Sequence, residues 1–468
     1  MADGFAHPAE LEFRAELARL LASTDEVATL LEEAPSTDSV RIEGPAALPP
    51  SEYDHGFFQA HEHHYSRDPA RMSEQLQGDL ALLDRVERVW ANQRREGTGR
   101  LRGVLRPESL PEGARFLDGH VYVHRVPAGQ PYELLVLGDL HGCYSVLKAA
   151  IMQARFFEKV DAYRREPGRH PLPLLVLLGD YIDRGLFSIN GVLRTVLQLV
   201  AAAPDHVYAL RGNHEYYVEV NGTIYGGVKP SEAINTLRPH VPMDVFRRYM
   251  AFFEGMPTSL LLDRSYFVHA GIPRDRTLKE RYVDLSSLND PDIRFQMMWS
   301  DPSAADVVPA ELQEKSARFP FGRLQAKAFL QRVGATVLVR GHEKVNEGFH
   351  VHYDEPGMKV VTLFSAGGAD NADLPGDSSY RSVTPMALTV KSDGEQVSLT
   401  PWAPDYRSYN DPARNAFFRV PPEIQHRAEG SKPQRSRCPG VGLGPGLGPR
   451  RAPWVAQRAA AQQRKPVL

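Results

Sequence analysis

Five short segments of the chain place carboxylate, imidazole or guanidinium side chains beside glycine, each after a run of apolar residues. They are GDLHG at residues 138–142, GDYIDRG at 179–185, RGNHE at 211–215, VHAG at 268–271 and VRGH at 339–342. Carboxylate together with imidazole suits borderline divalent metals such as manganese, iron or zinc, and no cysteine lies inside these segments. The residue types therefore predict a metal site.

The number of donors predicts more than one ion. Two aspartates, three histidines and an asparagine exceed what one open metal ion needs, and they suit two metals about 4 Å apart that share a carboxylate. Glycine beside the donors lets the backbone turn sharply. Arginines in the same segments offer a planar fork for phosphate oxygens. The combination indicates phosphate chemistry at a two-metal site.

The elements that must position these side chains alternate along the chain. Strands are predicted within residues 132–139, 173–180, 206–213, 265–271, 335–342 and 358–368, and helices within 144–157, 191–203, 244–256 and 324–334. Such alternation is typical of an α/β fold with parallel strands. Ligands in these folds gather where the strands end at their carboxyl edge. We therefore expect the five segments to meet at one edge.

The motif order GDxHG, GDxxDRG, GNHE, His-x-Gly and GH resembles the metallophosphoesterase superfamily and, within it, the PPP-type phosphoprotein phosphatases, as a bacterial-like member. The resemblance runs from about Glu133 to Phe364, roughly half of the chain. It implies a metallophosphoesterase β-sandwich of two mixed sheets flanked by helices. Nothing before Leu105 or after Asp405 is covered by it.

The resemblance also implies a role for individual residues. The first metal would be bound by Asp139, His141 and Asp180, and the second by Asp180, Asn213, His269 and His342, with Asp180 as the bridge. The implied cofactors are two divalent ions, with manganese expected and iron or zinc as alternatives. A hydroxide between the two metals is the implied nucleophile, which attacks phosphorus directly.

The remaining implied roles concern the substrate. His214 would protonate the leaving alkoxide, because the alkoxide of a serine or threonine phosphate is a poor leaving group. Asp183 would orient the His214 ring. Arg184, Asn213 and Arg318 would hold the phosphate. The assignment of Arg318 depends on the segment SARFPFG at 316–322 and on WSDP just upstream at 299–302.

One segment departs from the family pattern. The family usually has Ser-Ala-Pro-Asn-Tyr near the end of the catalytic domain, and its tyrosine lines the phosphate pocket. Here the corresponding stretch reads TLFSAGGADNAD, with Gly367 and Gly368 in place of proline and asparagine. Tyr380 lies too far along the chain to be assigned to that role. The departure concerns substrate preference more than metal chemistry.

Two other groups are left outside the predicted site. Cys143 follows the first motif and is interpreted as a small residue at a helix start. The histidine-rich stretch HEHHY at 61–65 is interpreted as a solvent-facing loop.

Composition limits the broad class of the protein. The 468 residues are 42% hydrophobic, which is typical of a globular protein. Their formal net charge of −3 creates no overall electrostatic field that would attract nucleic acid or a membrane surface. Two cysteines cannot build a disulfide framework or a zinc cluster. The start of the chain does not read as a secretory signal. These features predict a cytoplasmic protein with no nucleic-acid or membrane partner.

The chain is predicted to divide into three parts. Residues 1–115 read as a helical extension, 116–405 as the catalytic domain, and 406–468 as a disordered basic tail. Partners of the two terminal parts are not specified by their sequences.

Three functions are compatible with these observations. The favoured one is a phosphoprotein phosphatase acting on phosphoserine and phosphothreonine. The second is hydrolysis of a nucleotide such as a diadenosine polyphosphate, which the same donors permit. The third is a non-catalytic scaffold, which the complete donor set disfavours.

Overall fold

The computed structural model describes residues 39–52, 54–229, 231 and 241–419, and these belong to one compact unit. The helices predicted before residue 39 and the part of the predicted 406–468 tail that follows residue 419 lie outside the described residues. Residues 406–419 of that tail form short helical turns with buried aromatic side chains, so the prediction of disorder is wrong for them. Within the described ranges, we find no helix with the length and apolar character needed to cross a membrane.

The first sheet has six strands in the order β1-β17-β16-β4-β5-β6. Its strands are β1 (Val40–Ile42), β17 (Val397–Trp402), β16 (Ala387–Ser392), β4 (Tyr132–Leu137), β5 (Leu172–Leu177) and β6 (Val207–Ala209). β4, β5 and β6 run parallel to one another, whereas β16 is antiparallel to β4 and to β17. The three parallel strands therefore end at the same edge.

The second sheet has seven strands in the order β14-β15-β13-β10-β9-β3-β2. Its strands are β14 (Phe349–Glu355), β15 (Met358–Leu363), β13 (Val337–Arg340), β10 (Ser265–Val268), β9 (Ser259–Leu262), β3 (Val121–His124) and β2 (Arg115–Asp118). β10, β13 and β15 are parallel, and β9 is antiparallel to β10. Both sheets are thus mixed, as expected.

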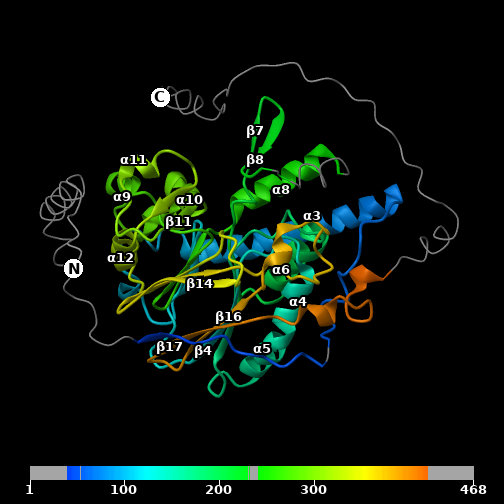
Figure 1. The fold of residues 1–468 in the computed structure, drawn as a ribbon, viewed down its shortest axis with the longest axis horizontal. Coiled ribbons are helices and arrows are strands. Elements are labelled where there is room, and N and C mark those ends of the chain that lie inside the picture. The colour runs from blue at the N-terminus through cyan, green and yellow to red at the C-terminus, as the bar shows by residue number, and fades with distance from the viewer. Residues whose placement is uncertain (1–38, 53, 230, 232–240, 420–468) are drawn as a thin grey trace, which may run out of the picture. The chain divides into compact units, whose positions relative to one another are not determined.

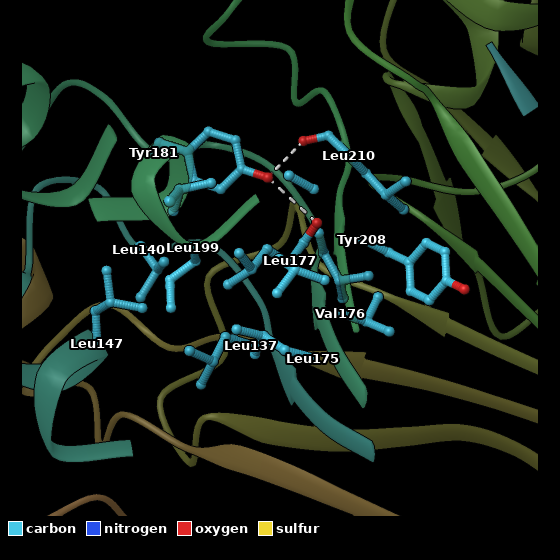
Figure 2. Packing of buried hydrophobic residues seen from close by; sticks show 14 of the residues in the cluster. Leu137, Leu140, Leu147, Leu175, Val176, Leu177, Tyr181, Leu199, Tyr208 and Leu210 are labelled. Atoms are coloured by element: carbon cyan, nitrogen blue, oxygen red, sulfur yellow. Dashed lines mark hydrogen bonds between the residues drawn. The ribbon is translucent and has the colours of Figure 1, made fainter. Parts of the chain in front are cut away.

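The main core lies between the two sheets. Alternate residues of β10 show this: Phe267 belongs to the cluster shared with β4 and β5, whereas Tyr266 and Val268 belong to a second cluster on the opposite face. All six residues of β5 are buried, so the strand is covered on both faces. Figure 2 shows this packing, with the Tyr181 hydroxyl donating to the Leu210 carbonyl at 2.7 Å.

Helices cover the outer faces of the sandwich. They are α3 (Pro69–Gly97), α4 (Tyr144–Gln153), α5 (Phe156–Arg165), α6 (Arg194–Ala202), α8 (Met243–Gly255), α9 (Asp275–Arg281), α10 (Pro291–Met297), α11 (Ala310–Gln313) and α12 (Arg323–Arg332). α5 and α6 contact β5 and β6 of the first sheet, and α12 contacts β15 of the second. In Figure 1, α9 to α12 group together, away from α4 to α6. The prediction of two mixed sheets flanked by helices is confirmed.

Short elements connect these layers. Two small sheets pair β7 (Tyr217–Val220) with β8 (Thr223–Gly226) and β11 (Ser300–Pro302) with β12 (Phe319–Phe321). Among the described residues, six short helical turns also occur, at η1 (Pro107–Ser109), η2 (Ser188–Leu193), η4 (Leu285–Asn289), η5 (Ser379–Ser382), η6 (Tyr406–Tyr409) and η7 (Ala416–Phe418). β7 begins two residues after the RGNHE segment, so this hairpin extends directly from the predicted site.

The described part of the N-terminal region joins the same unit. β1 pairs with β17, and α3 contacts β2, α6 and α8. α3 begins at Pro69, a residue suited to the first turn of a helix, with Asp68 as its N-cap. The proposed boundaries at 115 and 405 stay a prediction.

The interpretation of residues 61–65 as a solvent-facing loop is wrong for His61 and Glu62. Both side chains are buried, and Glu62 accepts a hydrogen bond from the buried Lys148 ammonium of α4 at 2.6 Å. Lys148 also contacts Asp54 at 2.8 Å. A buried charge is stable only when it is paired, so this cluster attaches residues 54–62 to α4.

Candidate metal centre

The loops that follow five parallel strands bring the predicted donors together. Asp139 follows β4, Asp180 follows β5, Asn213 follows β6, His269 follows β10 and His342 follows β13. All five side chains are buried, and so is that of His141. Two groups of ligand atoms each lie within 4.8 Å of one another: His141, Asp180 and His214, and Asp139, Asp180 and His269.

Asp180 lies at the centre of this cluster. Its Oδ2 is 3.6 Å from His141 Nε2, and its Oδ1 is 3.4 Å from His269 Nε2. Asp139 Oδ2 is also 3.6 Å from His141 Nε2. A carboxylate that faces both groups with different oxygens has the arrangement that a bridging ligand requires.

The tautomers of two histidines test whether cations fit here. His141 Nδ1 lies 3.0 Å from the Ile182 carbonyl, and His269 Nδ1 lies 3.0 Å from the Leu178 carbonyl. A carbonyl only accepts hydrogen bonds, so each Nδ1 carries the proton and each Nε2 presents a lone pair. These lone pairs face carboxylate oxygens, which are also acceptors. Divalent ions between them would resolve that conflict, so the donor set fits a metal.

The remaining two donors continue the same pattern. Asn213 Oδ1 lies 3.0 Å from His269 Nε2, and His342 Nδ1 lies 3.3 Å from the same nitrogen. His342 Nε2 is buried and has no hydrogen-bond partner. Nδ1 is therefore the nitrogen of His342 that faces the other donors.

Burial and charge set the protonation of the cluster. Burial raises the pKa of the Asp180 carboxyl well above its usual value, and the charges of Asp139 and Glu215 raise it further. Burial lowers the pKa of His269 to about 4. Burial, together with His269, also holds the pKa of His342 well below its usual value. Both rings are therefore neutral at pH 7, which is the form that binds metals.

Strained backbone holds the donors in place. Non-glycine residues His141, Asp180 and His342 have positive φ angles of 43°, 54° and 70°, a conformation that costs about 1 kcal/mol or more for each residue. The buried Glu215 carboxylate supports the second turn, since it accepts hydrogen bonds from the backbone N–H groups of Asp180 and Tyr181 at 2.9 and 2.8 Å.

Glycine is required where two of these turns approach each other. A Cβ at position 212 would lie 2.1 Å from Asp180 Oδ1, and one at position 341 would lie 2.3 Å from Asp139 Oδ1. Both distances are far below a van der Waals contact, so the RGNHE and VRGH segments need glycine at Gly212 and Gly341 for the loops to converge.

His214 is oriented toward the cluster by Asp183. Its Nδ1 lies 2.8 Å from Asp183 Oδ2, and its Nε2 lies 3.8 Å from Asp180 Oδ2. Its backbone N–H also donates to Asp180 Oδ1 at 3.0 Å. Both side chains are buried, so the ring has a fixed position with Nε2 directed into the site.

The two predicted phosphate-binding arginines differ in their surroundings. Arg184 is only partly buried, at the end of the GDYIDRG turn. Arg318 is about half exposed, with its side chain at 52%, and its Nε contacts Asp301 Oδ2 at 2.5 Å. Burial lowers the pKa of Arg318, but the contact with Asp301 raises it by more. The charge of Asp139 adds to that rise. Arg318 therefore lies in the field of the metal-binding carboxylates.

The sequence did not assign two residues that the structure places at the site. Asp301, from the WSDP segment, binds the buried Arg340 at 2.8 Å through Oδ1 while Oδ2 holds Arg318. The Tyr380 ring centroid lies 5.3 Å from that of His141. Tyr380, which could not be assigned a role from its position in the sequence, therefore lies beside His141 in space.

Comparison with known proteins relates one segment of the chain to a known family. Residues 132–346 match the family model described as calcineurin-like phosphoesterase. This segment of the chain is a calcineurin-like phosphoesterase domain. It contains the five donor-bearing loops, and the resemblance inferred from the motifs is confirmed at this level.

The curated relatives of this phosphoesterase domain carry phosphatase names. A probable serine/threonine-protein phosphatase of Encephalitozoon cuniculi is 29% identical over 283 residues, which is 59% of this chain and 55% of that protein. The serine/threonine-protein phosphatase 6 catalytic subunit of Caenorhabditis elegans is 27% identical over 245 residues, 52% of this chain and 66% of that protein. The chain thus spans about half to two thirds of the length of these relatives.

A solved structure also resembles the chain. It is a protein serine/threonine phosphatase from Saccharomyces cerevisiae, described as similar to human phosphatase PP5. It is 18% identical, covers 69% of this chain and 89% of its own, and superposes with a TM-score of 0.40. A likeness at this level supports no inference about activity.

Proposed function

We propose that the protein is a metal-dependent phosphoprotein phosphatase that hydrolyses phosphoserine and phosphothreonine. The observation that carries the proposal is the arrangement in which the Nε2 lone pairs of His141 and His269 face the oxygens of Asp180, because divalent cations between them would satisfy both kinds of donor atom. The family match supports phosphoester hydrolysis, and the names of the curated relatives favour protein substrates over nucleotides.

The residues proposed to hold two divalent ions are those that converge at the strand ends. They are Asp139, His141 and Asp180 for one ion, and Asp180, Asn213, His269 and His342 for the other, with manganese as the expected metal. When bound, the ions would supply Lewis acidity toward the phosphate and activate a water molecule as the nucleophile.

The protein's own side chains would then handle the proton and the phosphate. His214 would donate a proton from Nε2 to the leaving alkoxide. Burial, His141 and Arg184 hold the pKa of free His214 well below its usual value, but a phosphate dianion bound beside the ring favours the protonated form. Asp183 would stabilise the resulting imidazolium through the contact at Nδ1. Arg184, Asn213 and Arg318 would hold the phosphate oxygens.

The experiment that tests this function is a comparison of substrates. The full chain, reconstituted with manganese, would be assayed against a phosphoserine peptide, a phosphothreonine peptide, an aryl phosphate and a diadenosine polyphosphate. Faster turnover of the phosphopeptides supports the proposal. Faster turnover of the dinucleotide favours a nucleotide hydrolase, and a metal-loaded protein that cleaves none of them favours a non-catalytic scaffold.

A further inference from the structure

Tyr380 occupies a position beside the metal centre that no motif assigns. It lies in η5, within the loop of residues 365–383 that follows β15, which we call the strap. Its ring is tilted by 36° against His141 at a centroid distance of 5.3 Å, and it meets Phe364 edge-on at 5.3 Å. The side chain is only partly buried. The tyrosine therefore lies against one of the proposed metal ligands and is partly open to solvent.

The strap is held firmly, so this position is fixed. The Arg381 guanidinium donates to three backbone carbonyls of the strap at 2.7–2.9 Å. The Asp373 carboxylate accepts from the backbone N–H and the hydroxyl of Ser145 at the start of α4, at 2.5 and 3.0 Å. The Asp373 carbonyl accepts from Leu186 N at 2.8 Å, and Lys344 Nζ donates to the strap at 2.8 Å.

These anchors reach the loops that carry the proposed site. Leu186 lies two residues after Arg184, and Lys344 lies two residues after His342. Ser145 lies four residues after His141. The strap therefore places Tyr380 relative to both metal-binding groups rather than relative to one loop alone.

The chemistry of the nearest charged neighbour determines what the hydroxyl can do. Tyr380 is within hydrogen-bonding reach of the Arg184 guanidinium. A guanidinium has only donors, so the tyrosine oxygen is the acceptor in that contact and keeps its own proton for another group. A phosphate oxygen is a strong acceptor, and Arg184 is itself proposed to bind phosphate.

We propose that the Tyr380 hydroxyl donates a hydrogen bond to a phosphate oxygen of the substrate and forms, with Arg184, one wall of the phosphate pocket. This inference rests on the proposed function for its substrate class. It assigns the phosphate contact to a residue of the strap. The contact is made to charged oxygens, and loss of such a hydrogen bond reduces binding or rate by about 10- to 100-fold.

The test uses Tyr380→Phe, which keeps the ring against His141 and removes only the hydroxyl. Tyr406→Phe is the matched control, because Tyr406 packs against Gly368 of the same strap and has no proposed role in the site. Two readouts are compared in metal-loaded protein: kcat/KM for a phosphoserine peptide, and the affinity for inorganic phosphate measured by calorimetry. Melting curves check that each variant is folded.

The expected result is a loss of about 10- to 100-fold in kcat/KM and about tenfold weaker phosphate binding for Tyr380→Phe, with Tyr406→Phe within twofold of wild type. Unchanged phosphate affinity in Tyr380→Phe overturns the inference, even if the rate falls, because the ring then acts through packing alone. Phosphate binding also separates the two proposals. If the wild type binds phosphate through the hydroxyl but cleaves no substrate, the proposed function fails and this inference stands.

Discussion

Substitution of His214 by asparagine should slow substrates according to the quality of their leaving group. Asparagine removes the imidazole proton that is proposed to neutralise the departing alkoxide. The serine alkoxide is a strong base and needs that proton, whereas the anion of a nitrophenyl phosphate is already stable and needs it much less. The ratio of the two rates is therefore a direct measure of the proposed role.

The structure sets the expected size of the effect. The His214 side chain is 8% exposed and its Nδ1 is held at 2.8 Å by Asp183, so bulk water has little access to replace the missing group. The loss for a phosphoserine peptide should thus approach the full contribution of a positioned general acid, about 10²- to 10⁴-fold in kcat. For the aryl phosphate we expect a loss below about tenfold on the same reasoning.

The assay measures kcat for both substrates with metal-loaded wild type and variants. Asp183→Asn should give the same selectivity with a smaller loss, because the amide oxygen still orients Nδ1 but carries no charge to stabilise the imidazolium. His206→Asn removes another buried histidine, whose Nδ1 contacts the Pro173 carbonyl at 2.8 Å, and should leave the ratio unchanged. Equal losses on both substrates in His214→Asn would refute the general-acid role.

Two further predictions concern stability. Lys148→Met should destabilise the fold by about 3–5 kcal/mol, because it leaves the buried Glu62 carboxylate without its cationic partner. Lys159→Met, at a partly exposed ion pair, should cost at most about 1 kcal/mol. Urea unfolding of both variants measures this, and similar small losses would contradict the buried cluster. Burial holds the pKa of His124 near 3, and its Nδ1 lies 2.7 Å from the Tyr208 hydroxyl. Because the unfolded chain takes up this proton and the folded one does not, stability should fall by up to about 1.4 kcal/mol for each pH unit below about 6.5. His124→Gln should flatten that slope between pH 6.5 and 5, and an unchanged slope would assign the acid sensitivity to other groups.

The sequence predicts the strands that precede the metal-binding motifs better than it predicts the strands that carry no motif. β4, β5, β10 and β13 are apolar runs followed by glycine and a donor, and both signals are local. β1 is three residues long within a Pro/Gly-rich stretch, and its partner β17 lies more than 350 residues away. Its existence depends on a long-range pairing that no local pattern contains.

The same distinction applies to the site. Each of the five motifs contains the glycine that its turn needs beside the donor residue, so the convergence of the donors can be predicted from the sequence. Tyr380 has no such motif, and it reaches His141 only because Asp373 and Arg381 hold the strap in place. Burial of Glu62 likewise depends on contacts with Lys148 of α4 and with Ala416 of a C-terminal turn, whereas its local sequence is typical of an exposed loop.

The most direct test of this account is the metal content of the protein. The central claim is that side chains from five loops hold two divalent ions, with Asp180 shared between them. After reconstitution with manganese and removal of free metal, elemental analysis of the wild type should give two ions per chain, and Asp180→Asn should retain at most one. A wild-type protein that binds no manganese, or an Asp180→Asn variant with unchanged content, would contradict the claim.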